Sequence, residues 1–194
     1  MWQGDIDWEA VKESGIEFVI IKATEGVTYV DPTFIANWDG AKEAGLLVSA
    51  YHMLWPQLSP TKQAEHFLNT MGEREADFPL ALDVELNKTE GNIGAVVEEV
   101  LLALEAKEGR KPIIYTAQSF WGRHVGWAPG WSAYALWVAD YGAAAPAIPV
   151  GWEVYDFWQH SNRGSVPGIS GNVDLNIFVR GTEGLNNLGR KEER

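Results

Sequence analysis

The segment Pro79-Leu80-Ala81-Leu82-Asp83-Val84-Glu85 is apolar until its end, where it places two carboxylates two residues apart. Its apolar run is typical of a strand buried on both faces of a parallel sheet. Residues i and i+2 of a strand project from the same face, about 6.6 Å apart at ~3.3 Å per residue. We therefore expect Asp83 and Glu85 to share a face with Ala81. The opposite face, expected to pack against helices, carries Leu80, Leu82 and Val84.

Strand-like and helix-like segments alternate on both sides of this segment. The other expected strands are 17–22, 46–52, 112–116, 135–139, 153–159 and 173–178. Helix start signals stand at Asp31-Pro32 and Ser59-Pro60, and a regular apolar stripe runs through 93–104. This alternation predicts an α/β fold with a parallel sheet in one domain, residues 1–180, followed by a polar and frayed tail, 181–194.

The arrangement of polar residues favours a closed barrel over an open, doubly wound sheet. Barrel enzymes build their sites from the carboxyl ends of several strands. Polar residues recur at such ends here: Lys22, His52, Asp83, Glu85, Thr116, Asp140 and Gln159. A complete eight-fold barrel usually needs about 200 residues or more. Only seven strands are expected in this chain, so the barrel lacks an element.

Composition narrows the class of function. The chain has 194 residues and a formal net charge of −12, which argues against nucleic acid or an anionic membrane as partner. The absence of cysteine excludes disulfides and thiolate catalysis. The four histidines are dispersed, and no glycine-rich dinucleotide motif is present, so we expect no metal and no cofactor. The 10 tryptophans suit sugar stacking, although aromatic residues more often fill cores.

The pair Asp83 and Glu85 has the chemistry of an acid–base site. Two close carboxylates in a partly dry cleft cannot both ionise freely, so one stays protonated and can donate a proton. Cleavage of a glycosidic bond needs such a donor and a second carboxylate. The alternative is that the pair caps a helix or binds a cation. For Asp174, a buried structural role and a role as a third active-site acid are equally compatible with the sequence.

The chain resembles the family 25 glycoside hydrolases, the Chalaropsis-type lysozymes that are common as phage endolysins. The resemblance runs in family order over 2–178. Its segments are WQGDIDW (2–8), FVIIKATEG (18–26), YVDP (29–32), GAK (40–42), AGL (44–46), YH (51–52), LDVE (82–85), PIIYT (112–116), LWVADY (136–141), FWQ (157–159) and VDLN (173–176).

This resemblance implies an irregular β/α barrel that cleaves the β-1,4 bond between N-acetylmuramic acid and N-acetylglucosamine in peptidoglycan. It implies Glu85 as the general acid, Asp83 as the carboxylate that orients the substrate's 2-acetamido group in a substrate-assisted retaining route, and Asp174 as a further acid. The residues implied to position the sugar are Glu25, Tyr51, Tyr115, Trp137, Asp140 and Gln159. The spacing of the carboxylates does not distinguish retention from inversion.

The chain departs from the family pattern at its start. Family members begin with a strand reading roughly Gly-Ile-Asp-Val-Ser before the Trp-Gln-Gly, whereas this sequence starts at Met1-Trp2-Gln3-Gly4. Without that strand we expect an open seam, exposed strand edges and one carboxylate fewer. Three hypotheses follow: an active muramidase, an impaired or non-catalytic peptidoglycan-binding remnant, and another barrel glycosidase such as a chitinase-like enzyme.

The sequence also leads to expectations about where the protein acts. It has neither a run of about 18 uncharged apolar residues nor a recognisable secretory signal. We therefore expect a monomer that is made in the cytoplasm, in the manner of a phage endolysin, and acts on glycan strands of the bacterial cell wall.

Overall fold

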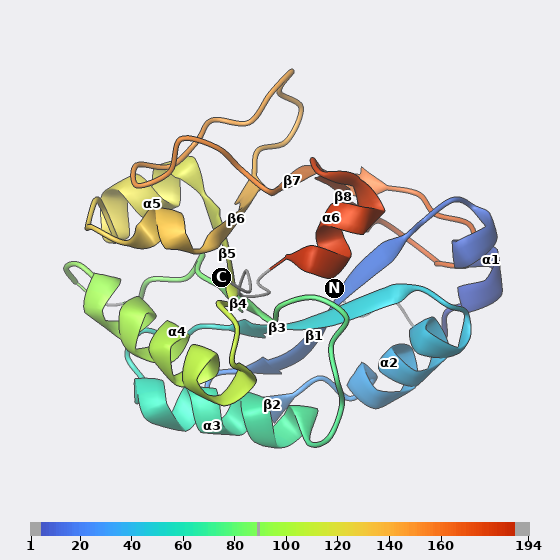
Figure 1. Ribbon diagram of the computed structural model, residues 1–194, viewed down its shortest axis with the longest axis horizontal. Helices are drawn as coiled ribbons and strands as arrows, with labels where there is room; N and C mark the ends of the chain where they lie inside the picture. The colour runs from blue at the N-terminus through green and yellow to red at the C-terminus, as the bar shows by residue number, and fades with distance from the viewer. Residues whose placement is uncertain (1–4, 89, 189–194) are drawn as a thin grey trace.

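A curved sheet of eight strands forms the centre of the computed structural model, which describes residues 5–88 and 90–188 (Figure 1). The strand order is β2-β1-β3-β4-β5-β6-β7-β8. The strands are β1 (Phe18–Glu25), β2 (Tyr29–Val30), β3 (Leu47–Met53), β4 (Ala81–Asp83), β5 (Ile113–Ala117), β6 (Ala135–Ala139), β7 (Phe157–Gly164) and β8 (Val173–Phe178). The helices are α1 (Trp8–Glu13), α2 (Phe34–Glu43), α3 (Pro60–Met71), α4 (Gly94–Glu108), α5 (Gln118–His124), the short 3-10 helix η1 (Trp131–Ala133) and α6 (Gly181–Asn187).

The sheet is a curled, incompletely closed barrel, which confirms the expected α/β barrel-like fold. Strands β1 and β3 to β7 pair in parallel, as the alternation predicts. The predicted parallel sheet is antiparallel at its two edges, where β8 pairs with β7 and the two-residue β2 pairs with β1. The physical reason for the direction of β8 is the short connection from β7, residues 165–172, because a parallel strand would need a crossover of about a dozen residues or more. Within the described ranges, β8 does not pair with β1.

Two apolar layers hold the sheet. The outer layer lies between the sheet and its covering helices, and it includes Leu80, Leu82 and Val84, as their parity predicts. The inner layer fills the barrel and includes Ala81. It is strongly aromatic: Phe18, Phe78 and Phe157 contact one another with ring centroids 5.8–6.2 Å apart. Most of the aromatic residues therefore have the core role that aromatic side chains usually have.

The segment after Gly181 differs from its prediction. Its polar composition predicts a frayed tail, but Gly181–Asn187 form helix α6, drawn in red close to the sheet in Figure 1. Leu185 and Leu188 are buried in the inner layer, which is the reason that this short helix docks. Residues 189–194 of the expected tail, like the Trp-Gln-Gly at 2–4, lie outside the described residues. No helix in the described part of the chain is long and apolar enough to cross a membrane.

A bulge in β1 re-aims side chains beside the strand's carboxyl end. Lys22 pairs with Tyr51 of β3, but Thr24 pairs with the next residue, His52, so Ala23 has no partner in the register. An extra residue of this kind shifts the alternation of faces. Lys22 and Glu25 thus both lie on the inner face, where they form an ion pair of 2.7 Å, and Thr24 faces the outer layer.

Candidate active site

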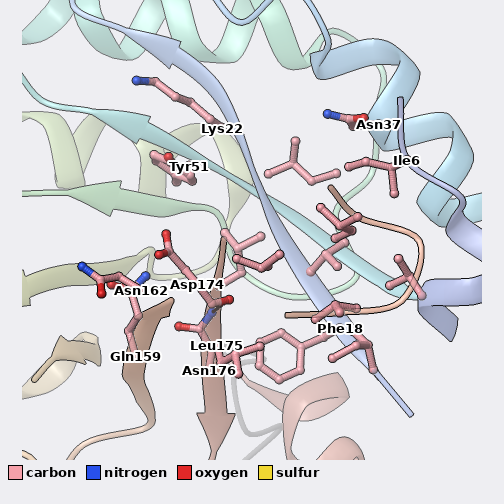
Figure 2. A pocket seen from close by; sticks show the side chains of 18 of the residues that line it. Ile6, Phe18, Lys22, Asn37, Tyr51, Gln159, Asn162, Asp174, Leu175 and Asn176 are labelled. Atoms are coloured by element: carbon pink, nitrogen blue, oxygen red, sulfur yellow. Dashed lines mark hydrogen bonds between the residues drawn. The ribbon is translucent and has the colours of Figure 1, made fainter. Parts of the chain in front are cut away.

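A cleft of about 500 Å³ opens at the carboxyl ends of the parallel strands and continues between β1 and β8. Seven of the nine residues assigned to the site from the sequence line it: Tyr51, Asp83, Glu85, Tyr115, Trp137, Gln159 and Asp174. In Figure 2, Lys22 and Tyr51 approach from β1 and β3, and Asp174 and Gln159 approach from β8 and β7. The topology therefore brings together residues that are far apart in the sequence.

Asp83 is the most buried acid of the cleft. It ends β4, its side chain is almost inaccessible, and its Oδ1 has no hydrogen-bond partner among the described residues. Burial raises its pKa well above the ordinary value, and the charge of the neighbouring Glu85 raises it further. Lys22 acts in the opposite direction. Asp83 is consequently a carboxyl group that resists ionisation and has unused hydrogen-bonding capacity.

Glu85 lies just after β4 and is accessible from solvent, unlike Asp83. The strand is shorter than predicted, yet both acids still line the same cleft. Partial burial raises the pKa of Glu85, and the charge of Asp174 raises it further. An exposed carboxyl group with a raised pKa is suited to be a general acid.

Asp174 reaches the cleft because β8 is antiparallel. It stands near the start of β8, and the start of an antiparallel strand lies at the same edge of the sheet as the carboxyl ends of the other strands. Partial burial raises its pKa. The structure therefore places Asp174 in the same cleft as Asp83 and Glu85.

Aromatic and amide side chains surround the acids through defined contacts. Gln159 Oε1 accepts hydrogen bonds from the hydroxyls of Tyr115 at 2.9 Å and Tyr141 at 2.6 Å. The indole N–H of Trp137 donates to Asn176 Oδ1 at 2.8 Å, and its ring packs edge-on against Tyr115 with centroids 4.6 Å apart. These contacts fix the wall of the cleft before any ligand binds.

Two of the residues assigned to sugar binding do not line the cleft. Glu25 lies beside it, where its Oε2 accepts from Lys22 at 2.7 Å and its Oε1 accepts from the Trp55 indole at 2.8 Å. Burial favours a higher pKa for Glu25, but these donors, with the positive charges of Lys22 and Lys88, hold the pKa below the ordinary value. Asp140 accepts from the Ala147 N–H at 3.0 Å, which fixes the following loop.

Two other polar residues at strand ends face the outer layer. The His52 ring stacks on Phe67 of α3, and the Thr116 hydroxyl donates to the Val84 carbonyl at 2.8 Å. The expectation that all such residues converge on the site is thus wrong for these two. Strand parity accounts for both, because each lies one residue after a cleft residue, Tyr51 and Tyr115 respectively.

Sequence reasoning missed several residues of the cleft. Lys22 is recognisable as a polar strand end but not as the ammonium that faces the acid cluster. Asn176 lies two residues after Asp174, so strand parity alone could have placed it on the same face. Asn162, by contrast, follows an irregularity in the register of β7 and β8, which leaves no periodic signal.

The arrangement can donate a proton to a neutral polar substrate. Glu85 supplies an accessible carboxyl group with a raised pKa, and Asp83 and Asp174 line the same cleft. Tyrosine, tryptophan and amide side chains provide flat faces and hydrogen-bonding groups of the kind that sugars use. Across residues 5–88 and 90–188, no group of three or more His, Asp or Glu is placed to hold a metal ion.

Comparisons with known proteins agree with this chemistry. Among curated proteins, the chain is 37% identical to "Lysozyme M1" of Streptomyces globisporus, over 91% of this chain and 65% of that protein. It is 41% identical to the "Autolytic lysozyme" of Clostridium acetobutylicum, over 92% of this chain and 54% of that protein. The chain thus spans about two thirds or less of the length of these relatives.

A solved structure is similar over nearly its whole length. The bacterial lysozyme from Streptomyces coelicolor superposes with a TM-score of 0.91 at 35% identity, over 97% of this chain and 93% of that one. The model of the family described as "Glycosyl hydrolases family 25" matches residues 1–169, which include Asp83 and Glu85 and end before Asp174. With its acids gathered in one cleft of this barrel, the chain belongs to glycosyl hydrolase family 25.

Proposed function

We propose that the protein is a lysozyme, an N-acetylmuramidase that hydrolyses the β-1,4 bond between N-acetylmuramic acid and N-acetylglucosamine in peptidoglycan. The observation that carries this proposal is the cluster of Asp83, Glu85 and Asp174 in one cleft, in which Glu85 is exposed and has a pKa raised first by partial burial and then by the charge of Asp174. The names of the relatives, which are lysozymes and muramidases, support the same reaction.

The proposed mechanism assigns a different task to each carboxyl group. Glu85 gives its proton to the glycosidic oxygen as the bond to C1 breaks, while the carbonyl oxygen of the substrate's own 2-acetamido group closes on C1. Asp83, behind Glu85, orients the acetamido group by accepting its N–H at the Oδ1 that has no partner among the described residues. Water then attacks C1 and passes a proton to the Glu85 carboxylate, which restores the acid. Partial burial, and after it the charge of Asp174, keep the Glu85 pKa high until the first step.

Substitution of Glu85 by glutamine tests the proposal. Glu85→Gln keeps the size of the side chain but cannot donate a carboxyl proton, so lysis of purified cell walls should fall by about 100-fold or more. Glu99→Gln, on helix α4 away from the cleft, is the matched control and should lyse walls like the unchanged protein. Wall lysis that survives Glu85→Gln would refute the proposal, and a preference for chitin would favour a chitinase-like enzyme.

A second candidate function is peptidoglycan binding with impaired catalysis. The observation that favours it is the open seam: within the described residues, only the two-residue β2 pairs with β1 on the seam side, at Thr24 and Glu25, β8 pairs with no strand on that side, and the cleft extends along both β1 and β8. A strand reading Gly-Ile-Asp-Val-Ser, added ahead of Trp2, would pair with these edges and bring in a further carboxylate. If the seam limits catalysis, this addition should increase wall lysis by about tenfold or more. Equal lysis with and without it would contradict impairment.

The setting of the reaction belongs to the same proposal. A muramidase of this kind acts on glycan strands of the bacterial cell wall, and we propose that it does so as a monomer in the manner of a phage endolysin. The solved structure of the CTP1L endolysin supports this setting, since it is 31% identical, with a TM-score of 0.80, over 92% of this chain and 63% of that one. Light scattering of the purified protein measures the oligomeric state.

A further inference from the structure

Gln63, on helix α3, holds the loop that follows β3. Its side chain is fully buried, and its Oε1 accepts a hydrogen bond from the Trp55 backbone N–H at 2.8 Å. Its Nε2 donates to the backbone carbonyls of Trp55 at 3.0 Å and Leu58 at 3.3 Å. Because a backbone N–H only donates and a carbonyl only accepts, these contacts fix which end of the amide is oxygen.

The orientation of this amide determines the proton position on His52. The His52 Nε2 lies 3.4 Å from Gln63 Oε1, which can only accept, so Nε2 carries the proton. Burial lowers the pKa of His52 to about 4, so the ring is neutral and its Nδ1 accepts from the Thr24 hydroxyl at 2.7 Å. Every hydrogen bond from β1 to the loop at Trp55 therefore has one defined direction.

The network continues to the cleft on the other side of Trp55. The Trp55 indole N–H donates to Glu25 Oε1, whose second oxygen accepts from Lys22. Lys22 lines the cleft that holds Asp83 and Glu85. The β1 bulge makes this connection possible, because it directs Thr24 outward to His52 while Lys22 and Glu25 stay on the inner face.

We propose that Gln63 and His52 are positioning residues that hold Trp55 and Glu25 in place and thereby fix the Lys22 ammonium beside the catalytic carboxyl groups. The inference rests on the proposed function, since Glu85 is taken as the acid. Gln63, His52, Trp55 and Glu25 do not contact the substrate in this scheme, and they affect it only by positioning Lys22. The network lies behind the cleft and acts by holding the Lys22 side chain in position.

The expected consequence is electrostatic. Lys22 lowers the pKa of both Asp83 and Glu85, against the effect of their burial. The groups that face Lys22 are Glu25 on β1, Tyr29 on β2, Tyr51 and Met53 on β3, and Asp83 and Glu85 at the end of β4. If the network is cut, Lys22 and Glu25 move relative to the acids, and the pKa of Glu85 rises.

Two variants cut the network at different points. Gln63→Leu removes all of the amide's hydrogen bonds, and Thr24→Val removes only the hydroxyl that donates to His52. Thr24→Ser keeps that hydroxyl and should restore the behaviour of the unchanged protein. Thr70→Val, on the same helix α3, removes a hydroxyl that donates to the His66 carbonyl and is the control for a general effect on stability.

NMR provides readouts that do not depend on turnover. The Trp55 indole N–H signal, assigned by its loss in Trp55→Phe, should shift and exchange faster with solvent in Gln63→Leu and Thr24→Val. The Glu85 titration, followed by carboxyl carbon chemical shifts, should move upward by about half a pH unit. In wall-lysis kinetics, KM should rise about threefold while kcat changes less than about twofold at the pH optimum.

Several outcomes would overturn the inference. An unchanged indole signal and an unchanged Glu85 titration in both network variants would do so, as would the same shifts in Thr70→Val, which would make the effect a general one. A wild-type protein that lyses no walls would refute the proposed function, but the two NMR readouts would still decide whether Gln63 and His52 position Trp55. If Gln63→Leu does not fold, the pair Thr24→Val and Thr24→Ser decides.

Discussion

Replacing Gln159 by leucine perturbs the wall of the cleft in a way whose magnitude follows from the structure. Leucine has nearly the same size but offers no acceptor to the Tyr115 and Tyr141 hydroxyls. Tyr141 is 47% exposed and can turn to water, whereas Tyr115 is only 7% exposed and keeps, among the described residues, only the Tyr141 hydroxyl as a neighbouring partner. Tyr115 cannot escape by ionising, because burial and then the charges of Glu85 and Asp83 raise its pKa.

The expected loss of stability is therefore dominated by one buried hydroxyl. A buried donor that loses its acceptor costs about 1–3 kcal/mol, so the free energy of unfolding should fall by about that amount. For a chain of this length, each kcal/mol lowers the melting temperature by roughly 2–4 °C, so thermal unfolding should shift downward by roughly 2–12 °C.

Denaturation in urea with a matched control checks this reasoning. Tyr141→Phe removes only the exposed partner and should change the free energy of unfolding by less than about 0.5 kcal/mol. Gln159→Leu should also weaken binding of glycan fragments, because Tyr115 supports Trp137 across a ring contact of 4.6 Å. The reasoning is refuted if Gln159→Leu is as stable as the unchanged protein, or if Tyr141→Phe costs as much as Gln159→Leu.

Three further predictions concern other parts of the molecule. Gly168→Ala should cost at least about 2 kcal/mol in urea unfolding, because Gly168 has φ +89° and a Cβ would lie 2.2 Å from the Asp7 carbonyl oxygen; a neutral result would contradict this close approach. His52 should show neutral-ring NMR signals well below pH 6 and titrate only near its pKa of about 4. Because the unfolded chain binds this proton already near pH 6.5, the free energy of unfolding should decrease as the pH falls below about 6.5. Titration of His52 near pH 6.5 would contradict its burial. Asp174→Asn should move the alkaline limb of wall lysis to lower pH, since burial and then Asp174 raise the pKa of Glu85, which must be protonated to act; an unmoved limb would separate Asp174 from Glu85.

Hydrophobic periodicity is sufficient to predict a strand where the strand is buried on both faces or where apolar and polar residues strictly alternate along it. The run that ends in Asp83 predicts both the strand and the faces of its side chains, because parity depends only on local geometry. It could not predict the direction of β8, which depends on the length of a connection, nor helix α6, whose docking depends on the non-local contacts of Leu185 and Leu188. Two-residue strands such as β2 have no period to detect.

In the site, too, some residues could be predicted from local periodicity and others could not. Asp83 and Glu85 could be assigned from their position at a strand end, whereas Tyr115 is implied only by the family resemblance, and all three line the cleft. Lys22 lies in the cleft, as its position at a strand end predicts, but periodicity could not place Glu25, because strict alternation from Lys22 would put Thr24 on the inner face and Glu25 on the outer one. The bulge at Ala23 reverses this assignment, and no residue type in the segment 18–25 marks it. A single unpaired residue therefore limits what the sequence alone predicts of the cleft.

The burial of Asp83 connects stability with the proposed chemistry. Its Oδ1 has no partner among the described residues, and such a group costs about 1–3 kcal/mol. Burial of a large aromatic side chain removes about 150–250 Å² from water, worth about 4–6 kcal/mol before entropy is counted, so the inner layer around Phe78 and Phe157 can offset the cost. The unsatisfied oxygen then has a use in the proposed reaction. A bound acetamido N–H would supply the missing donor. The desolvation cost of Asp83 Oδ1 in the free protein would then be offset by a hydrogen bond that forms only when the substrate is held in position.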